Sequence, residues 1–188
     1  MRIVIAALLG AIVIFFWQFL SHMVLPIGEM GFRLPQNEQA EDAVLQAVSP
    51  NFPTAGIYYL PSVDPKKMGD EVVMKAWAEK AQKNPWVFMV VNPPPADPMS
   101  MAPHLVKQFI TNFLAALIAA FVLAATPWTL GMRVVGAGAF GIFGWLADLV
   151  PQWTWYRFPA DFIVGGLIDQ GVGWLLAGIA IAWWLGRR

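Results

Sequence analysis

The feature that most constrains this chain is an apolar run near its start, because residues 3–20 contain no charged side chain. A helix of about 20 apolar residues is long enough to cross the hydrocarbon core of a bilayer. A secretory signal peptide is the rival interpretation, since Arg2 precedes the run. The run is longer than the apolar part of a typical signal peptide, and FLSHMVLP offers no small-residue cleavage site. We therefore predict an uncleaved transmembrane helix within residues 1–26.

Three more apolar segments follow, at residues 105–125, 134–150 and 158–185, separated by TPWTLGMR and PQWTWYR. The composition agrees, because 58% of the residues are hydrophobic and 13% are charged, whereas soluble domains average about 25% charged. These values exclude an ordinary soluble enzyme, a disordered chain and a basic nucleic-acid-binding protein. The absence of cysteine excludes disulfides, thiolate metal sites and cysteine nucleophiles. The sequence therefore predicts a helical membrane protein, a bundle of four transmembrane helices.

The arginines predict the orientation of this bundle. The loop at residues 151–157 carries only Arg157, and the remaining arginines near the spans fall on the other side. Because lysine and arginine are enriched in cytoplasmic loops, we expect both termini in the cytoplasm. Aromatic side chains crowd the loop on the outer side, where amphipathic rings favour the interface. The arginines assigned to the cytoplasmic side are Arg2, Arg133, Arg187 and Arg188.

Between the first two spans lies a mildly acidic stretch, residues 27–103, with nine acidic and six basic side chains. Its patterns predict a helix at residues 37–48 capped by Asn37, a strand at 55–60, a helix at 68–83 and a strand at 86–91. We expect a small α+β insert on the exoplasmic side, with residues 104–188 forming the other three spans. So short a segment has little core, so it is expected to lean on the membrane helices or on a partner.

Small residues predict how the spans pack, because close backbone approach replaces the hydrophobic effect as the driving force in lipid. Alanines and glycines recur on one face in each of the last three spans. They favour a compact bundle, and the same positions are also suited to a homodimer contact. They are Ala115, Ala116, Ala119, Ala120, Ala137, Gly141, Gly165, Gly166, Gly173 and Ala177.

Polar groups within the spans are the default functional candidates, because each is costly in lipid unless it is paired. Under the predicted orientation all of them fall in the outer half of the membrane. His104, Gln108, Thr111 and Asn112 follow helical spacing and form one stripe. The candidate pocket residues are Gln18, His22, His104, Gln108, Asn112, Asp148, Asp161 and Asp169.

Two interpretations of these polar groups remain open. In one they pair with each other across helices and have a structural role. In the other His22 and His104 bind a metal together with one of the carboxylates, or a haem between two imidazoles. Neutral imidazole suits copper, zinc and iron, and the thioethers of Met99 and Met101 favour Cu(I). The chain has no HxxH or HExxH spacing that would favour the metal site.

Asp169 has two possible depths. If the last span begins near Pro159, about ten residues at 1.5 Å each place Asp169 near the midplane, where an acid is protonated, paired or part of an ion path. If the span begins near Gly165, Asp169 is interfacial, and Arg157 is then a candidate partner. We favour a structural or pocket-lining role over proton-coupled transport, because no pair of broken helices accompanies this acid.

Three segments, SHMVLPIGEMGFRLPQNE, QFITNFLAALIAAF and FPADFIVGGLIDQGVGWLLAGIAIAW, give most of the chain a resemblance to a group of bacterial four-span integral membrane proteins without an assigned activity. The resemblance implies an inner-membrane protein with a periplasmic insert after the first span. It implies no reaction, cofactor or functional residue.

The sequence contains no phosphate loop and no nucleophile elbow, since GAGAFGIFG lies within an apolar span and no serine has a GxSxG context. We therefore expect a non-catalytic protein that acts through assembly, either as an accessory subunit of a membrane complex or as a small homo-oligomer. The alternative is an outer-leaflet binder of copper, zinc, haem, quinone or lipid, with its polar pocket around His22 and His104.

Overall fold

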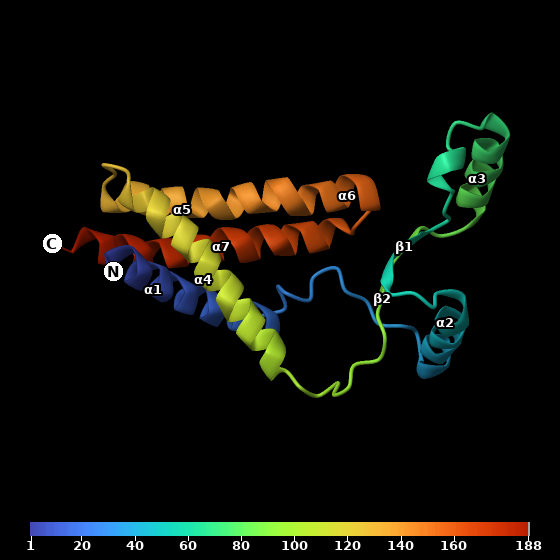
Figure 1. The fold of residues 1–188 in the computed structure, drawn as a ribbon, viewed down its shortest axis with the longest axis horizontal. Coiled ribbons are helices and arrows are strands. Elements are labelled where there is room, and N and C mark those ends of the chain that lie inside the picture. Colours follow the sequence, from blue (N-terminus) through green and yellow to red (C-terminus); the bar gives the residue numbers. More distant parts are fainter. Residues whose placement is uncertain (188) are drawn as a thin grey trace. The chain divides into compact units, whose positions relative to one another are not determined.

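The structure, a computed structural model, describes residues 1–187, so the predicted contribution of Arg188 to the cytoplasmic charge lies outside the described residues. The chain forms two compact units (Figure 1). The helical unit combines residues 1–32 with the segment that begins at Met99, and the insert comprises residues 33–98. Each unit is described by itself.

The helical unit contains four apolar helices of membrane-spanning length, as predicted. The first consists of α1 and a π-helical turn, and the third consists of α5, a second π-helical turn and α6. The elements are α1 (Arg2–Phe19), its π turn (Leu20–Val24), α4 (Ala102–Ala124), α5 (Leu130–Gly144), its π turn (Trp145–Leu149), α6 (Val150–Tyr156) and α7 (Ala160–Gly186).

The third long helix corrects the sequence prediction. Residues 151–156 were expected in a loop, but they continue the helix to Tyr156. Pro151 has no N–H to donate, and a proline is tolerated in the first turn of a helix. Here it follows the π turn and occupies the first turn of α6. The chain then reverses at Arg157, whose left-handed φ of 59° ends α6.

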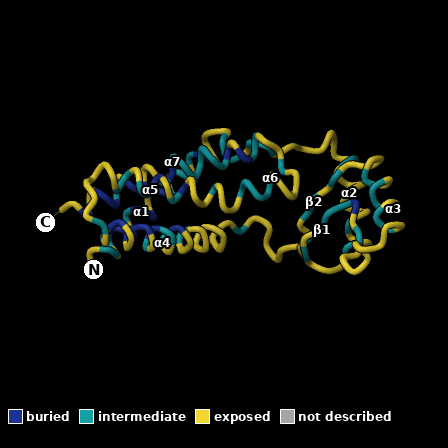
Figure 2. Tube along the Cα trace, turned by 90° about the horizontal axis from the view of Figure 1, so that it is seen from above, coloured by how far each residue is buried: buried dark blue, intermediate teal, exposed yellow. Residues whose placement is uncertain are grey.

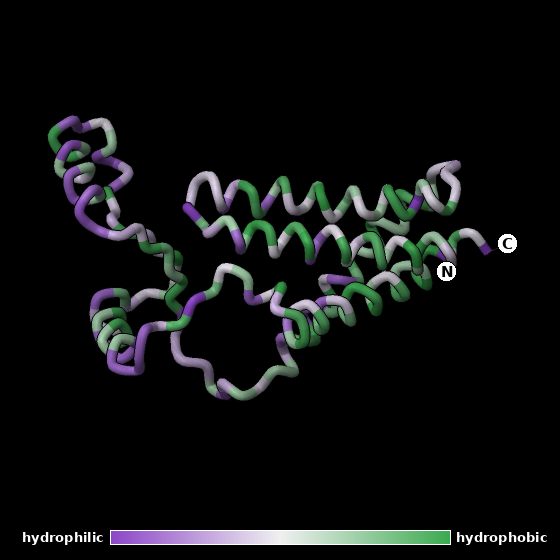
Figure 3. Tube along the Cα trace, turned by 180° about the vertical axis from the view of Figure 1, so that it is seen from behind, coloured by the Kyte–Doolittle hydropathy of each residue, from purple (hydrophilic) through white to green (hydrophobic). Residues whose placement is uncertain are grey.

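The four helices pack as neighbours in the order α4, α1, α7, α5, as contacts between elements show. α4 meets α5 only near the turn that joins them, where Gly136 lies against Leu123. The core between the helices consists mainly of alanines, with Leu123 and Ile181 as its largest fully buried side chains. Much of the length of these helices is hydrophobic (Figure 3), and many of their large apolar side chains are exposed, such as Phe121 and Phe143.

Close approach of backbones holds α5 against α7. A Cβ added at Gly141 would lie 2.4 Å from the carbonyl oxygen of Gln170, and one at Gly178 would lie 2.5 Å from Ala137 Cβ. Glycine is therefore required at both positions unless the neighbouring helix shifts. Arg2, Arg133 and Arg187 lie at the end of the unit where α1 and α5 begin and α7 ends (Figure 1), which we call the arginine end. There the Arg2 guanidinium donates to the carbonyl oxygens of Leu185 and Arg187.

The insert has the predicted order of helix, strand, helix and strand. Asn37 caps the first helix by accepting a hydrogen bond from Ala40 N (2.8 Å), as expected. The second helix begins at Glu71 rather than at residue 68, because a short 3₁₀ turn at residues 65–67 precedes it and Asp70 forms its cap. The strands form an antiparallel pair. The elements are α2 (Glu38–Asn51), β1 (Gly56–Leu60), α3 (Glu71–Lys83) and β2 (Val87–Val91).

Candidate binding sites

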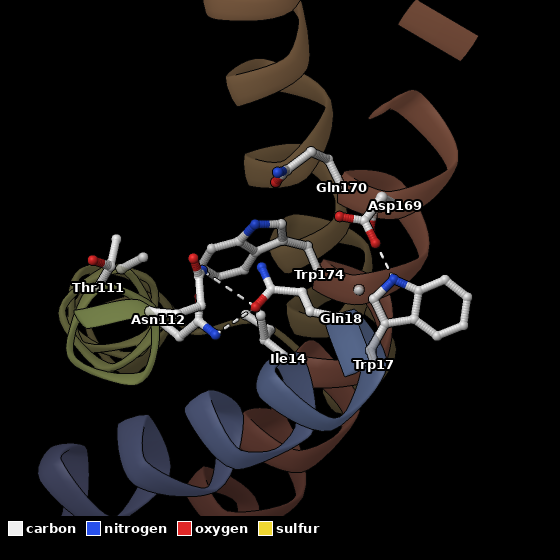
Figure 4. Close-up of a pocket in the computed structure, with 11 residues that line it drawn as sticks. Ile14, Trp17, Gln18, Thr111, Asn112, Asp169, Gln170 and Trp174 are labelled. Atoms are coloured by element: carbon white, nitrogen blue, oxygen red, sulfur yellow. Dashed lines mark hydrogen bonds between the residues drawn. The ribbon is translucent and has the colours of Figure 1, made fainter. Parts of the chain in front are cut away.

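A cavity of about 190 Å³ lies between α1, α4 and α7 (Figure 4). α4 packs on α1 but has few contacts with α7, which leaves space between them away from the arginine end. Polar side chains from all three helices line this space. The lining residues are Ile14, Trp17, Gln18, Gln108, Thr111, Asn112, Ala115, Asp169, Gln170, Gly173 and Trp174.

Three amides join α1 to α4 at the cavity. Asn112 Nδ2 donates to Gln18 Oε1 (2.7 Å), and Gln108 Nε2 donates to Asn112 Oδ1 (3.0 Å) and at 3.3 Å to Gln18 Oε1. Gln108 and Asn112 are one helical turn apart, so both face α1. Asn112 is buried, with 5% of its surface exposed. This interhelical network is the pairing that the structural interpretation of these residues predicts.

A second set of hydrogen bonds joins α1 to α7. Ser21, which is fully buried, donates to Asp169 Oδ1 at 2.5 Å, and Trp17 Nε1 donates to the Asp169 carbonyl oxygen at 3.0 Å. His22 Nδ1 lies 2.8 Å from Ser21 Oγ and 3.1 Å from the Gln18 carbonyl oxygen. Since the Ser21 hydrogen points to Asp169 and a carbonyl only accepts, Nδ1 carries the His22 hydrogen in this arrangement.

Asp169 is therefore placed by its partner on α1. α7 begins at Ala160, close to the start near Pro159 that would place Asp169 at the midplane. Asp169 nevertheless bonds to Ser21, which lies in the final turn of the first long helix. The start of α7 extends past the end of the first long helix, since Gly165 packs against Ile27 and Met30 in the segment that follows that helix. Asp169 thus lies near the end of α1, and its carboxylate bonds to Ser21 rather than to Arg157.

An apolar groove of about 1030 Å³ adjoins the polar cavity along α1 and α4. Gln18, Gln108, Asp169 and Gln170 line both spaces, so the groove and the cavity adjoin at these residues. The remaining groove residues are mostly large and apolar. They are Ile12, Phe15, Phe16, Phe19, His22, Met23, Met101, Leu105 and Phe109.

Four of the predicted pocket residues meet at the cavity, namely Gln18, Gln108, Asn112 and Asp169. His22 and Met101 line only the groove. The other candidates line neither space: His104, Met99 and Asp148 are exposed, and Asp161 accepts a hydrogen bond from Phe162 N at the start of α7. Within residues 1–187 no three His, Asp or Glu side chains are close enough to hold one metal ion.

Sequence reasoning gave Trp17 and Trp174 no role at this site. Trp17 lies against Gly173, where an added Cβ would come within 2.8 Å of the indole ring. Gly173 lies one helical turn after Asp169, on the same face of α7. In the sequence, a glycine one turn after an acid is the signal that predicts a large side chain packed against the glycine.

The insert offers a second candidate site, its apolar surface. Within residues 33–98 only Pro61 is buried (Figure 2). Ile57 and Val90 are opposite each other in the β1–β2 pair and are 65% and 60% exposed. The other large hydrophobic residues exposed on the insert are Leu34, Val44, Leu45, Met68, Val72 and Val87.

Comparison of the chain with protein-family models, with curated proteins and with solved structures found no match.

Proposed function

We propose that this chain is a four-span protein of the bacterial inner membrane that acts without catalysis, as an accessory subunit joined to another protein through its periplasmic insert. The observation that carries the proposal is the small core of residues 33–98, in which Pro61 is the one buried residue and the other apolar side chains are half-buried or exposed. A free domain of about 60 residues normally buries about 60% of the surface of its unfolded chain. A partner that covers the insert supplies this burial.

The free energy gained by covering the exposed apolar side chains of the insert favours a protein partner. Covering one valine, leucine or isoleucine contributes about 1.5–3 kcal/mol, and the insert exposes several. A two-stranded hairpin is marginal by itself in water, and in the described residues each of β1 and β2 has one strand neighbour and therefore one outer edge. A strand of a partner can pair with such an edge while its side chains cover Ile57 and Val90.

The arginine end supports the proposed orientation. Arg2, Arg133 and Arg187 gather there, and positive charge favours the cytoplasmic side. The segments that lead into and out of the insert leave from the opposite end of the helices, after Val24 and before Ala102. Both termini are then cytoplasmic and the insert is periplasmic.

The proposal is tested by native mass spectrometry of the full chain, extracted from its own membranes in a mild detergent. The parent is compared with the double variant Ile57→Ser, Val90→Ser and with the control Lys75→Ser, Lys80→Ser, which changes exposed polar positions of the same insert. We expect a second, different chain in the spectra of the parent and the control, and its loss from the double variant.

The other outcomes are equally informative. Two copies of this chain, separated by the double variant, replace the accessory subunit with the homo-oligomer. If the parent protein appears only as a monomer in the spectra, assembly is contradicted. The apolar surface of the insert would then be covered by the helices or by the bilayer surface. A partner retained by the double variant removes the β1–β2 surface from the proposal.

A further inference from the structure

The cavity between α1, α4 and α7 contains one carboxylate, that of Asp169, and no lysine or arginine lines it. Ser21 donates to Oδ1 of this group, whereas within residues 1–187 no side chain donates a hydrogen bond to Oδ2. His22 reaches the carboxylate only through the Ser21 hydroxyl. A carboxylate within an apolar helical unit is costly unless a cation, a proton or several hydrogen bonds compensate it. Asp169 therefore favours a positively charged group in the cavity.

The oxygens around the cavity also match such a group. A primary ammonium has three N–H donors and no acceptor. Besides Asp169, Gln108 and Gln170 line the cavity, and within the described residues neither of their side-chain oxygens accepts a hydrogen bond. Figure 4 shows Gln170 beside Asp169 on α7, facing the amides of α1 and α4. Three acceptors are thus available for three donors.

The volumes indicate an amphipathic molecule. A cavity of about 190 Å³ is smaller than the roughly 300–1,000 Å³ of a typical ligand pocket, so it suits a polar head rather than a whole ligand. The apolar groove of about 1030 Å³ opens from the same residues and is lined by phenylalanines of α1 and α4. The polar and apolar spaces are therefore arranged end to end, as in a molecule with a small head and a long chain.

We propose that the cavity and the groove together bind one amphipathic molecule, with a protonated amine head beside Asp169 and an alkyl or acyl chain along the groove. The shared chemistry is an ammonium group joined to a hydrocarbon chain. Either a free long-chain amine or an ethanolamine phospholipid of the membrane supplies it. This site is independent of the surface by which the insert would assemble with a partner.

The test is native mass spectrometry of the purified, delipidated full chain with added octadecylamine or phosphatidylethanolamine. Octadecanol and phosphatidylglycerol serve as probes that have similar chains and lack the amine. We expect the amine probe to bind at a concentration at least about tenfold lower than its control, a difference of about 1.4 kcal/mol. Octadecylamine alone bound in this way indicates a free amine, and phosphatidylethanolamine alone indicates a membrane lipid.

Two variants and a control locate the binding. Asp169→Asn keeps the shape of the side chain and removes its charge, so amine binding is expected to fall to the level of octadecanol. Asp148→Asn removes a carboxylate that lines neither space and is expected to leave binding unchanged. Ala115→Leu fills the cavity while it keeps the Asp169–Ser21 bond, and it tests the site even if Asp169→Asn does not fold.

The proposal is overturned if neither amine probe binds more tightly than its own control, or if folded Asp169→Asn and Ala115→Leu both bind like the parent protein.

Discussion

In the helical unit Ala6, Ala7 and Ala11 have no exposed surface, whereas in the insert Pro61 alone is buried. Both units nevertheless expose large apolar side chains, such as Phe143 on α5 (70%) and Val72 on α3 (78%). On the helices these side chains belong to continuous apolar surfaces, while on the insert they alternate with charged residues. Under the proposed function, exposed hydrophobic residues have two roles in one chain, because lipid would cover the first kind and a partner protein the second.

The comparison also separates two ways of gaining stability. The helices are held by small side chains that let backbones approach, so their packing is complete within the unit and sensitive to added volume. The insert has local structure, such as helix caps and a strand pair, with almost no interior. Changes in the helical unit should therefore have large steric effects, and changes in the insert should have small local ones.

The largest effect is expected from Gly141→Ala. The new Cβ would lie 2.4 Å from the Gln170 carbonyl oxygen, and a backbone atom cannot move away alone. Overpacking of this kind costs about 1–3 kcal/mol, which thermal unfolding in detergent measures as a lower Tm. Gly144→Ala on the same helix meets nothing within 4 Å and serves as the control. Equal Tm values for the two variants would show that α5 and α7 are not in close contact.

A smaller loss is expected from Asn112→Ala, which removes the hydrogen bond to Gln18 Oε1 between α1 and α4. Interhelical hydrogen bonds in membrane proteins contribute about 0.6 kcal/mol on average and up to about 1.7, so we expect a decrease of about 1 kcal/mol in unfolding free energy. Thr111→Ala is the neighbouring control, because Thr111 bonds only to the carbonyl of Lys107 in its own helix. The amide network makes no contribution if both variants unfold alike.

The smallest effect on the whole molecule is expected from Asp70→Ala, which removes the cap that accepts from Val72 N and Val73 N. Loss of such a cap costs about 1 kcal/mol. Faster amide hydrogen exchange in residues 71–83, with an unchanged Tm for the helical unit, is the expected result. Asp70→Ser retains a capping oxygen and should exchange like the parent. A fall in the Tm of the helical unit would show that the two units unfold together.

The sequence predicts the long helices because continuous apolar runs and length define them, and it predicts the α2 cap because Asn37 precedes a helical pattern. It also brings Gln108 and Asn112 to one face, since helical spacing is regular. The buried face of α1 was missed. Every residue of that run is apolar, so periodicity gives no signal that Ala6, Ala7 and Ala11 face the core.

Two other features were not predictable from local patterns. Helical continuation through Pro151 depends on the π turn before it, which no residue pattern marks. The bond between Ser21 and Asp169 depends on another π turn and on how far α7 extends past α1, which is a matter of tertiary packing. Helical spacing placed His104 on the same stripe as Gln108 and Asn112, yet His104 does not line the cavity.

The contact between α1 and α7 has a consequence for biosynthesis. α1 is synthesised before α7, against which it packs, and Arg2 donates to the carbonyl oxygen of Leu185. At roughly 5–20 residues per second, about 160 residues of synthesis separate the end of α1 from the end of α7, or about 10–30 s. During that interval the indole N–H of Trp17 on α1 and the hydroxyl of Ser21 in the following π turn lack their acceptors on α7. An insertion factor that shelters a waiting helix would therefore act on α1, before the bundle can close.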